Sequence, residues 1–380
     1  MPGVLTASFA LGIAAVAIWL GPALQIVWRL HGIRPTFSAI NTSSCRVLDD
    51  PYLNGCEQSV IHSPSGLAFL ACAVDTSIRS RWFPPLFHYD QEAALTPKGA
   101  IVVLNLKTAK ATPLKLEGFP PTFHPHGMSV ITSPENPDEV LIGAVNHRPD
   151  GSTIELFSHN LKSHTAQHLE TFKDEKILFA PNDLELVDRH SFYATNDRGH
   201  AKHLGRLALG WAKGGHVIFK DADGKARVVA DKLDYPNGIA LSADKHFVWV
   251  ADASQAQVIK FERKPNNGLR LRDVVELPHF SDNISVEPTT GAVYVAGIQE
   301  GFSCSVVFAR NGFACPAAVT KITNNTDQDV FFGKKYKTQP VFVDDGSRIE
   351  AISTAGVHLR LKKSIAGGIG KGVVMCDEAW

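Results

Sequence analysis

Residues 235–241 read YPNGIAL, a proline-containing tripeptide followed by a short apolar run, and variants of this pattern recur along the chain. The five copies are SPSGLAF, HPHGMSV, APNDLEL, YPNGIAL and FSDNISV, with Ser65, His126, Asn182, Asn237 and Asn283 at their variable positions. Successive copies lie 61, 56, 55 and 46 residues apart. Four-stranded units of about 40–50 residues, with insertions, are typical of a β-propeller. Five copies, with one further blade completed by joining the two chain ends, predict six blades.

Most of the chain after residue 59 has the composition of short strands. Runs such as DEVLIGAVN, HFVWVAD and AVYVAGI alternate with Gly, Pro, Asn and Asp, and amphipathic helical stretches are scarce. The main exception is residues 198–216, which we expect to form a helical or irregular excursion. We therefore predict an all-β fold in which residues 40–380 form one β-propeller domain.

The variable positions of the repeats are predicted to meet in space, because the innermost strand of every blade begins at the same face of the channel. The residues so placed are Glu57, His126, Asn182, Asp183, Asn237, Asp282 and Asn283, with Glu57 assigned to the closing blade. Carboxylate and amide oxygens suit Ca²⁺ far better than Zn²⁺. Any one of these residues could instead form a turn before a strand. Their shared position in the repeat favours a convergent metal site.

Two histidines indicate chemistry beyond a structural metal. His126 occupies a repeat position, and His147 in VNHRPDGS follows about one strand and one turn later in the same blade. Two adjacent imidazoles can act as a general base and its partner, because histidine titrates near neutral pH. The other histidines are interpreted as ordinary core or surface residues.

The amino-terminal segment differs from the rest of the chain. Residues 4–28 contain no charge and are long enough to cross a hydrocarbon layer of roughly 30 Å as a helix. We interpret residues 1–32 as a signal or signal-anchor segment, with a buried core helix as the alternative. The nearest basic residues, Arg29 and Arg34, lie on the side that the positive-inside rule disfavours for a lumenal domain. A secretory location is predicted, membrane-anchored or secreted, with cleavage of the leader left open.

Cysteines and glycosylation sequons fit an oxidising compartment. The six cysteines show no CxxC spacing, and a bridge from Cys45 to Cys376 would tie the chain ends, but six cysteines allow 15 pairings and the sequence does not select one. Sequons occur at Asn41 and Asn324. Asn283-Ile284-Ser285 also reads as a sequon, but we expect it inside the channel, where a glycan would not fit.

The charge balance bears on the partner. The chain has 38 basic and 38 acidic residues and no basic run of five or more, so nothing indicates a nucleic-acid partner. A small neutral or anionic molecule is compatible with this composition, and the oligomeric state is not indicated.

Longer segments resemble the serum paraoxonase/arylesterase family. The matching segments are HPHGMSV, VNHRPDGSTIELF, PNDLELVDRHSFYATND, YPNGIALSADKHFVWVAD and DNISVEPTTGAVYVA. The resemblance runs from about Cys45 to Cys376 and implies a six-bladed β-propeller with two calcium ions, acting as a lactonase and aryl esterase and sometimes on organophosphates. It also implies an uncleaved hydrophobic amino terminus that contacts lipid.

The resemblance implies roles for individual residues. The catalytic calcium would be held by Glu57, Asn182, Asn237, Asp282 and Asn283. The His126–His147 pair would form the catalytic dyad, and Cys45 would be bonded to Cys376. Calcium would polarise the carbonyl group while the dyad activates water.

Two features depart from the family pattern. A second, structural calcium would use Asp183, the backbone carbonyl of Met128 and an acid at position 58, where this chain has Gln58. Loss of that charge predicts a weaker or absent second ion. The aromatic-rich residues 77–99 have no clear counterpart and are expected to shape or cover the site mouth.

Three other functions remain open from the sequence. A gluconolactonase-type calcium propeller would use a similar ligand set, and a metal-free strictosidine-synthase-like propeller would not need it. A membrane-tethered propeller could also serve only as a binding platform. The histidine pair and the terminal cysteines favour the paraoxonase-like interpretation.

Overall fold

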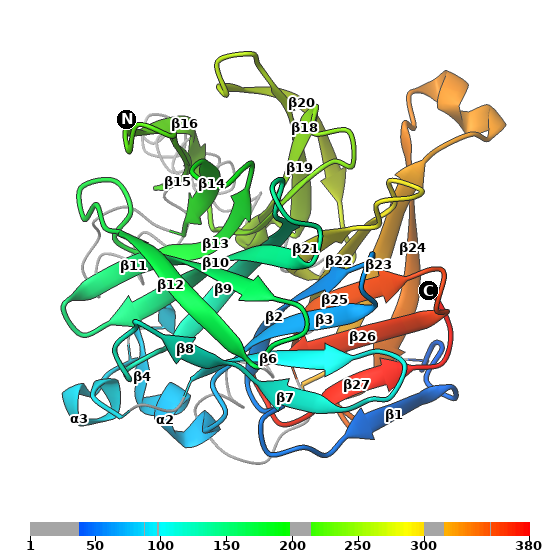
Figure 1. The fold of residues 1–380 in the computed structure, drawn as a ribbon. Coiled ribbons are helices and arrows are strands. Elements are labelled where there is room, and N and C mark those ends of the chain that lie inside the picture. Colours follow the sequence, from blue (N-terminus) through cyan, green and yellow to red (C-terminus); the bar gives the residue numbers. More distant parts are fainter. Residues whose placement is uncertain (1–37, 87, 97–98, 198–213, 300–314, 350) are drawn as a thin grey trace, which may run out of the picture.

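Six β-sheets of four or five strands each are arranged in a ring in the described residues (Figure 1). The computed structural model describes residues 38–380 apart from 87, 97–98, 198–213, 300–314 and 350. The inner strands of neighbouring sheets contact one another in order around the ring, and the last contacts the first. The predicted all-β, six-bladed propeller is therefore confirmed.

The first three blades follow one another along the chain, each running from an inner to an outer strand. Blade 1 contains β2 (Cys56–His62), β3 (Leu67–Cys72), β6 (Ala100–Asn105) and β7 (Ala111–Pro113). Blade 2 contains β9 (Pro125–Thr132), β10 (Glu139–Arg148), β11 (Gly151–Asn160), β12 (Thr165–Phe172) and, parallel to β12, β8 (Lys115–Glu117). Blade 3 contains β13 (Pro181–Leu186), β14 (Phe192–Asn196), β15 (Gly215–Lys220) and β16 (Ala226–Leu233).

Blades 4 to 6 complete the ring in the same inner-to-outer order. Blade 4 contains β17 (Pro236–Leu241), β18 (Phe247–Asp252), β19 (Gln257–Arg263) and β20 (Leu269–Glu276). Blade 5 contains β21 (Phe280–Val286), β22 (Val293–Ile298), β23 (Ala317–Asn324) and β24 (Tyr336–Asp344). Blade 6 contains β25 (Ile352–His358), β26 (Lys363–Gly368), β27 (Val373–Cys376) and β1 (Cys45–Leu48).

Helical structure is sparse in the described residues. Its elements are α2 (Thr76–Arg81), η1 (Pro84–Leu86), α3 (Gln91–Ala94), η2 (Ala253–Gln255) and η3 (Gln328–Phe332). The first three, with the small hairpin of β4 (Trp82–Phe83) and β5 (His88–Tyr89), form an insertion between β3 and β6 of blade 1. We call residues 75–95 the blade 1 insertion.

The core lies between adjacent blades, which explains the nearly continuous apolar runs. In β18 all residues after Phe247 are buried, because both faces of this strand are covered by neighbouring blades. One hydrophobic cluster joins Tyr193 and Val217 of blade 3 to Ile239 and Val248 of blade 4. Such clusters hold each blade to the next.

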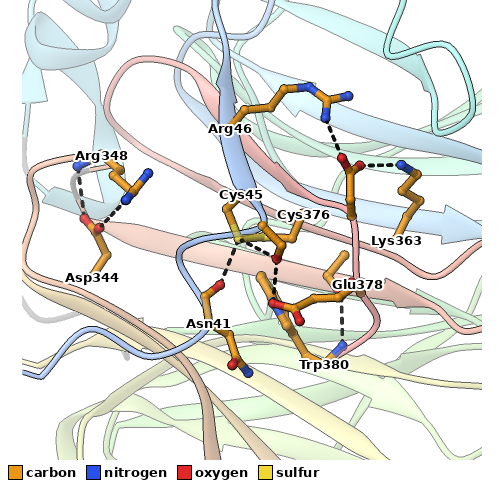
Figure 2. The surroundings of a disulfide bond; sticks show 12 residues. Asn41, Cys45, Arg46, Asp344, Arg348, Lys363, Cys376, Glu378 and Trp380 are labelled. Atoms are coloured by element: carbon orange, nitrogen blue, oxygen red, sulfur yellow. Dashed lines mark hydrogen bonds and ion pairs between the residues drawn. A yellow bond between two sulfur atoms is a disulfide. The ribbon is translucent and has the colours of Figure 1, made fainter.

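Blade 6 is closed by the two ends of the chain, as predicted. β1 pairs antiparallel with β27, and Cys45 lies opposite Cys376, to which it is disulfide-bonded. Figure 2 shows this bond and, near it, Arg46 and Lys363, both of which pair with Asp377. The chain end is also tied to blade 5, since the Tyr294 hydroxyl donates to the Trp380 carbonyl at 2.6 Å.

The other described cysteines are also oxidised. Cys56 is bonded to Cys72 across β2 and β3. Cys315 is disulfide-bonded as well. The part of the chain that the structure describes contains no free cysteine.

The bond at the chain ends should stabilise the fold more than the bond within blade 1. In the chain-entropy relation, the difference in stabilisation between two disulfides depends on the logarithm of the ratio of their loop lengths. The two loops here are 331 and 16 residues long, so the difference in unfolding free energy is about 3 kcal/mol. We expect a Cys45→Ser/Cys376→Ser variant to lose that much more unfolding free energy than Cys56→Ser/Cys72→Ser, measured by denaturant titration. Equal losses would contradict this account.

Two details of the repeat assignment were wrong. Ser65 lies in the turn between β2 and β3, not before an inner strand. The inner strand of that blade is β2, so Glu57 belongs to blade 1, whereas the closing blade takes its inner strand from β25. SPSG resembles the repeat because a Pro–Gly turn joining two strands has the same residue types.

Two predictions concern residues that the structure does not describe. The signal or anchor segment, residues 1–32, lies outside the described residues, and so do residues 198–213 of the expected excursion. Gly215 and His216 begin β15. Within the described part of the chain, no helix is both long and apolar enough to cross a membrane.

Candidate active site

The inner strands bring together side chains that are far apart in the sequence. Glu57 lies on β2, His126 on β9, Asn182 and Asp183 on β13, Asn237 on β17, and Asp282 and Asn283 on β21. Asn283 Nδ2 donates to Glu57 Oε1 at 2.9 Å, and His126 Nε2 lies 3.4 Å from the same oxygen. Blades 1, 2 and 5 therefore meet directly at Glu57.

A bulge occurs at the same place in every blade. The register between the inner and second strands shifts near the start of each inner strand. On β13, for example, Asn182 and Asp183 together oppose Thr195, and on β21 Asp282 and Asn283 oppose one residue of β22. Bulges re-aim side chains next to functional sites. They allow two consecutive residues of one strand to contribute to the centre.

Glycine in the repeat has a steric reason. A Cβ atom on Gly127 would lie 2.3 Å from Asp183 Cα, and one on Gly238 would lie 2.5 Å from Asn283 Cα. These distances are far inside van der Waals contact, so inner strands of neighbouring blades pass too closely for any side chain. The glycines of HPHG and YPNG thus keep the ring tight around the site.

The site concentrates acidic groups away from solvent. Burial raises the pKa of Glu57, but His126, with Arg79 and Asn283, outweighs burial and lowers it below its ordinary value. Burial, followed by the charge of Glu57, raises the pKa of Asp282 well above its ordinary value. Several carboxyl groups packed together out of water cost much free energy unless a cation or protons compensate.

Five side-chain oxygens at the centre accept no hydrogen bond although they are buried. They are Glu57 Oε2 and the Oδ1 atoms of Asn182, Asn237, Asp282 and Asn283. Buried acceptors without a donor are rare in folded proteins. In the described residues no group of three His, Cys, Asp or Glu is placed to hold a metal, so an ion here would depend on the amide oxygens as well. Mixed carboxylate and amide oxygens fit Ca²⁺.

The two predicted histidines are in contact. His126 Nδ1 and His147 Nε2 lie 2.9 Å apart, and His147 Nδ1 lies 2.9 Å from Ser152 Oγ. Both rings are buried. His126, His147 and Ser152 thus form a hydrogen-bonded chain, and His126 Nε2, at the end nearest the acidic centre, lies 3.4 Å from Glu57 Oε1.

The blade 1 insertion packs on this histidine pair. The Phe83 ring contacts His126 and His147 edge-on, with centroids 4.8 and 5.7 Å apart. Trp82 Nε1 donates to the His147 carbonyl at 2.7 Å, and the guanidinium of Arg79 stacks on Phe83. The expectation that residues 77–99 cover the site agrees with these contacts.

Arg79 is a buried cation beside the centre. Its Nη2 donates to the Pro125 carbonyl at 2.8 Å. Burial lowers the pKa of Arg79 to about 10, although the charge of Glu57 acts in the opposite direction. Arg79 therefore stays charged at neutral pH and contributes positive potential next to the acidic residues.

The sequence interpretation missed the contributions of Arg79, Phe83 and Ser152, and also that of blade 6. Ser353, at the bulge of β25, donates its hydroxyl to the Glu57 carbonyl at 2.7 Å. Its segment, AISTAGV, has no proline before the variable position and no Asn, Asp or His at it, so the repeat gave no signal. Ser353 lies 70 residues after Asn283, beyond the intervals of 46–61 residues between the copies, so spacing gave no signal either.

The residues expected at a second ion are also adjacent. Asp183 Oδ1 accepts from the Met128 amide at 3.1 Å, and Asp183 Oδ2 accepts from Gln58 Nε2 at 3.0 Å. Burial, more than the charge of Glu57, raises the pKa of Asp183 well above its ordinary value. The Met128 contact is made by its amide, whereas the expected ligand was its carbonyl.

The predicted sequons differ in accessibility. Asn41 and Asn324 are exposed. Asn283 is buried, and its side-chain nitrogen donates to two oxygens of Glu57. An attached glycan at Asn283 is incompatible with this structure.

Comparison with known proteins gives consistent matches. The family model described as Arylesterase matches residues 37–377. The chain is 30% identical to human serum paraoxonase/arylesterase 2 over 304 residues, 78% of each chain. It is 29% identical to serum paraoxonase/lactonase 3 of Oryctolagus cuniculus over 356 residues, 89% of this chain and 92% of the relative.

Solved structures share the fold at low sequence identity. A luciferin-regenerating enzyme superimposes with a TM-score of 0.52 at 11% identity, covering 89% of this chain and 95% of the other. A gluconolactonase of Xanthomonas campestris gives a TM-score of 0.50 at 13% identity, covering 90% and 98%.

Proposed function

Because this chain belongs to the arylesterase family, and so to hydrolases that act on esters or lactones, we propose that it is a calcium-dependent lactonase and aryl esterase. The observation that carries the proposal is the group of five unpartnered oxygens beside a buried histidine pair. The relatives named above are called paraoxonase/arylesterase and paraoxonase/lactonase. A small-molecule ester or lactone is therefore the proposed substrate.

The proposed calcium ligands are the five residues whose oxygens lack a donor. Glu57 and Asp282 supply charge, and Asn182, Asn237 and Asn283 supply neutral oxygens. The Asn283 amide nitrogen donates to Glu57, which leaves Asn283 Oδ1 for the ion. When bound, calcium supplies a Lewis acid for the carbonyl oxygen of the substrate and for the negative charge that develops on it.

The proposed base is His126. Its Nε2 is on the side of Glu57 and takes the proton from the attacking water, while its Nδ1–H donates to His147 Nε2. In this proposed tautomer His147 Nδ1–H donates to Ser152 Oγ. His147 and Ser152 keep His126 oriented and help to spread the positive charge it gains.

The location of the enzyme is a further part of the proposal. The uncharged residues 4–28 support a signal or anchor segment, followed by a single propeller domain over residues 40–380 in the secretory pathway, either anchored to membrane or lipid or secreted. Disulfides in the described residues and exposed sequons at Asn41 and Asn324 agree with an oxidising, lumenal or extracellular site. Mass spectrometry before and after glycosidase treatment would test this location, which predicts glycans at Asn41 and Asn324.

Substrate size should depend on Phe83, which covers both histidines. We expect Phe83→Ala to raise kcat/KM for a bulky aryl ester, relative to a small lactone, by about 10-fold, because hydrophobic contacts discriminate on that scale. Tyr89→Ala, in the same hairpin but with its ring against Trp82, should leave the ratio unchanged. An unchanged ratio in Phe83→Ala would remove Phe83 from substrate selection.

The proposed function is tested by a substrate panel with and without EGTA. The panel contains aliphatic lactones, aryl esters and a sugar lactone, and the calcium content of the same protein is measured by mass spectrometry. Hydrolysis that stops on calcium removal and returns on addition supports the proposal. Full turnover after exhaustive removal would exclude the metal role, and selective cleavage of the sugar lactone would favour a gluconolactonase-type enzyme.

A further inference from the structure

Asp183 is a buried carboxylate whose oxygens are all in use. Its Oδ1 accepts from the Met128 amide of blade 2 at 3.1 Å. Its Oδ2 accepts from the Ile239 amide of blade 4 at 3.1 Å and from the Gln58 side chain of blade 1 at 3.0 Å. Asp183 itself belongs to blade 3, so this one carboxylate connects four neighbouring inner strands by N–H donors alone.

Gln58 is equally occupied, and its orientation is determined by its neighbours. Its Oε1 accepts from the Ser59 amide at 2.8 Å and from Thr354 Oγ1 of blade 6 at 2.8 Å. Reversing the side-chain amide would place its NH₂ group against the Ser59 N–H and its oxygen against the Asp183 carboxylate, two repulsive contacts. Gln58 Nε2 must therefore point at Asp183.

The side chains of Asp183 and Gln58 differ from the proposed calcium ligands in their hydrogen bonding. Each of the five proposed calcium ligands has one buried oxygen that accepts nothing, whereas no oxygen of Asp183 or Gln58 is left without a donor. A cation bound to Asp183 Oδ2 would have to displace the Gln58 N–H group. Asp183 would then be the only negatively charged ligand among Gln58, Asp183 and Thr354. Hard cations bind weakly to sites with so few charged oxygens.

We propose that the Gln58 amide takes the place of a second metal ion, so that a hydrogen-bonded hub of Gln58, Asp183 and Thr354 joins the inner strands of five blades without metal. The chain then binds calcium at the first site alone. The first site belongs to the proposed function, but the hub is tested by metal counts and melting temperatures, which do not depend on activity.

The decisive variant is Gln58→Glu, which keeps the size of the side chain and replaces the donor with a carboxylate. Two carboxylates about 3 Å apart repel unless a proton or a cation lies between them. We expect this variant to bind one calcium per chain more than the wild type, by mass spectrometry and by calorimetric titration. In EGTA its Tm should lie roughly 5 °C below that of the wild type. Adding calcium should raise the Tm of this variant by more than it raises the Tm of the wild type.

Gln58→Met is the matched control, since it keeps chain length but has neither donor nor charge. Its Tm should fall by a similar amount in EGTA and in calcium, relative to the wild type, and it should gain no ion. A Gln58→Glu variant with no more calcium than the wild type would overturn the hub. If that variant does not fold, the wild-type count decides, because one ion or none supports the hub and two ions overturn it.

The same counts separate the hub from the proposed function. A wild type that binds no calcium while Gln58→Glu binds one would refute the calcium-dependent mechanism and still support the hub. A wild type with two ions would refute the hub and leave the mechanism intact.

Discussion

Replacing Asn237 by Ala should lower kcat/KM for both lactones and aryl esters by about 10³-fold, the order found when one group that stabilises a developing oxyanion is removed. Asn237 Oδ1 is buried without a donor, so the substitution removes its interaction with a bound ion, together with the hydrogen bond between the Asn237 and Asp282 side chains. Asp282→Ala should abolish hydrolysis outright, because it removes a proposed ligand that is charged when calcium is bound. Initial rates and calcium content, measured on the same preparations, check both results.

Asn325→Ala is the control variant for a general loss of stability on replacing a buried asparagine. Asn325 is buried to a similar degree as Asn237 but lies beyond the end of β23, where it bonds to Asp329 and Lys334. Its substitution should leave kcat/KM unchanged in folded protein. Near-normal turnover in Asn237→Ala, with normal calcium content, would show that this oxygen does not take part.

Replacing His126 by Gln should lower kcat by about 10²- to 10⁴-fold on both substrate classes, the usual contribution of a positioned general base. Glutamine preserves a polar side chain near His147 but cannot take a proton at neutral pH. Calcium content should stay at the wild-type value, which separates loss of the base from loss of the ion. His147→Gln should have a smaller effect, because His147 acts through His126.

His159→Gln is the matched control for the histidine prediction. His159 is a buried histidine of the same blade, and its ring bonds to the Thr165 carbonyl, in the outer part of that blade. This variant should retain the wild-type rate. Wild-type turnover in His126→Gln, on lactones and aryl esters alike, would instead remove His126 from the mechanism.

The fold was predictable because the repeat reports a steric requirement that recurs around the ring. Gly127 and Gly238 are needed where inner strands nearly touch, and the Asn or His before each glycine sits at a bulge. Blade 6 was counted correctly from the chain ends, but its inner strand escaped detection because Ser353 has no proline before it and no Asn or Asp beside it. Glu57 was recognised as a site residue yet placed in the wrong blade, because the turn sequence SPSG was taken for the repeat copy of blade 1.

Two features of the site could not be predicted from the sequence: the orientation of the Gln58 side-chain amide and the contacts of the blade 1 insertion. Gln58 reads as a weakened metal ligand, and only its contacts with Ser59 and Asp183 show that its nitrogen, not its oxygen, meets the carboxylate. The blade 1 insertion follows no repeat, so Phe83 could be assigned to the site mouth in general but not to the histidine pair. Pairwise contacts of this kind carry no periodic signal.

The bulges separate the chemistry of the site from the packing of the blades. Pro236 lies opposite Asp252 and Ile239 lies opposite Val250, so the one-residue excess of β17 is taken up at Asn237 and Gly238. Beyond this bulge, Ile239 and Leu241 pack toward blade 3, whereas Ala240 packs toward blade 5. Removing Asn237 would leave these pairings and directions in place while taking one ligand position from the centre. A blade can therefore gain or lose a ligand position at its bulge without repacking its core.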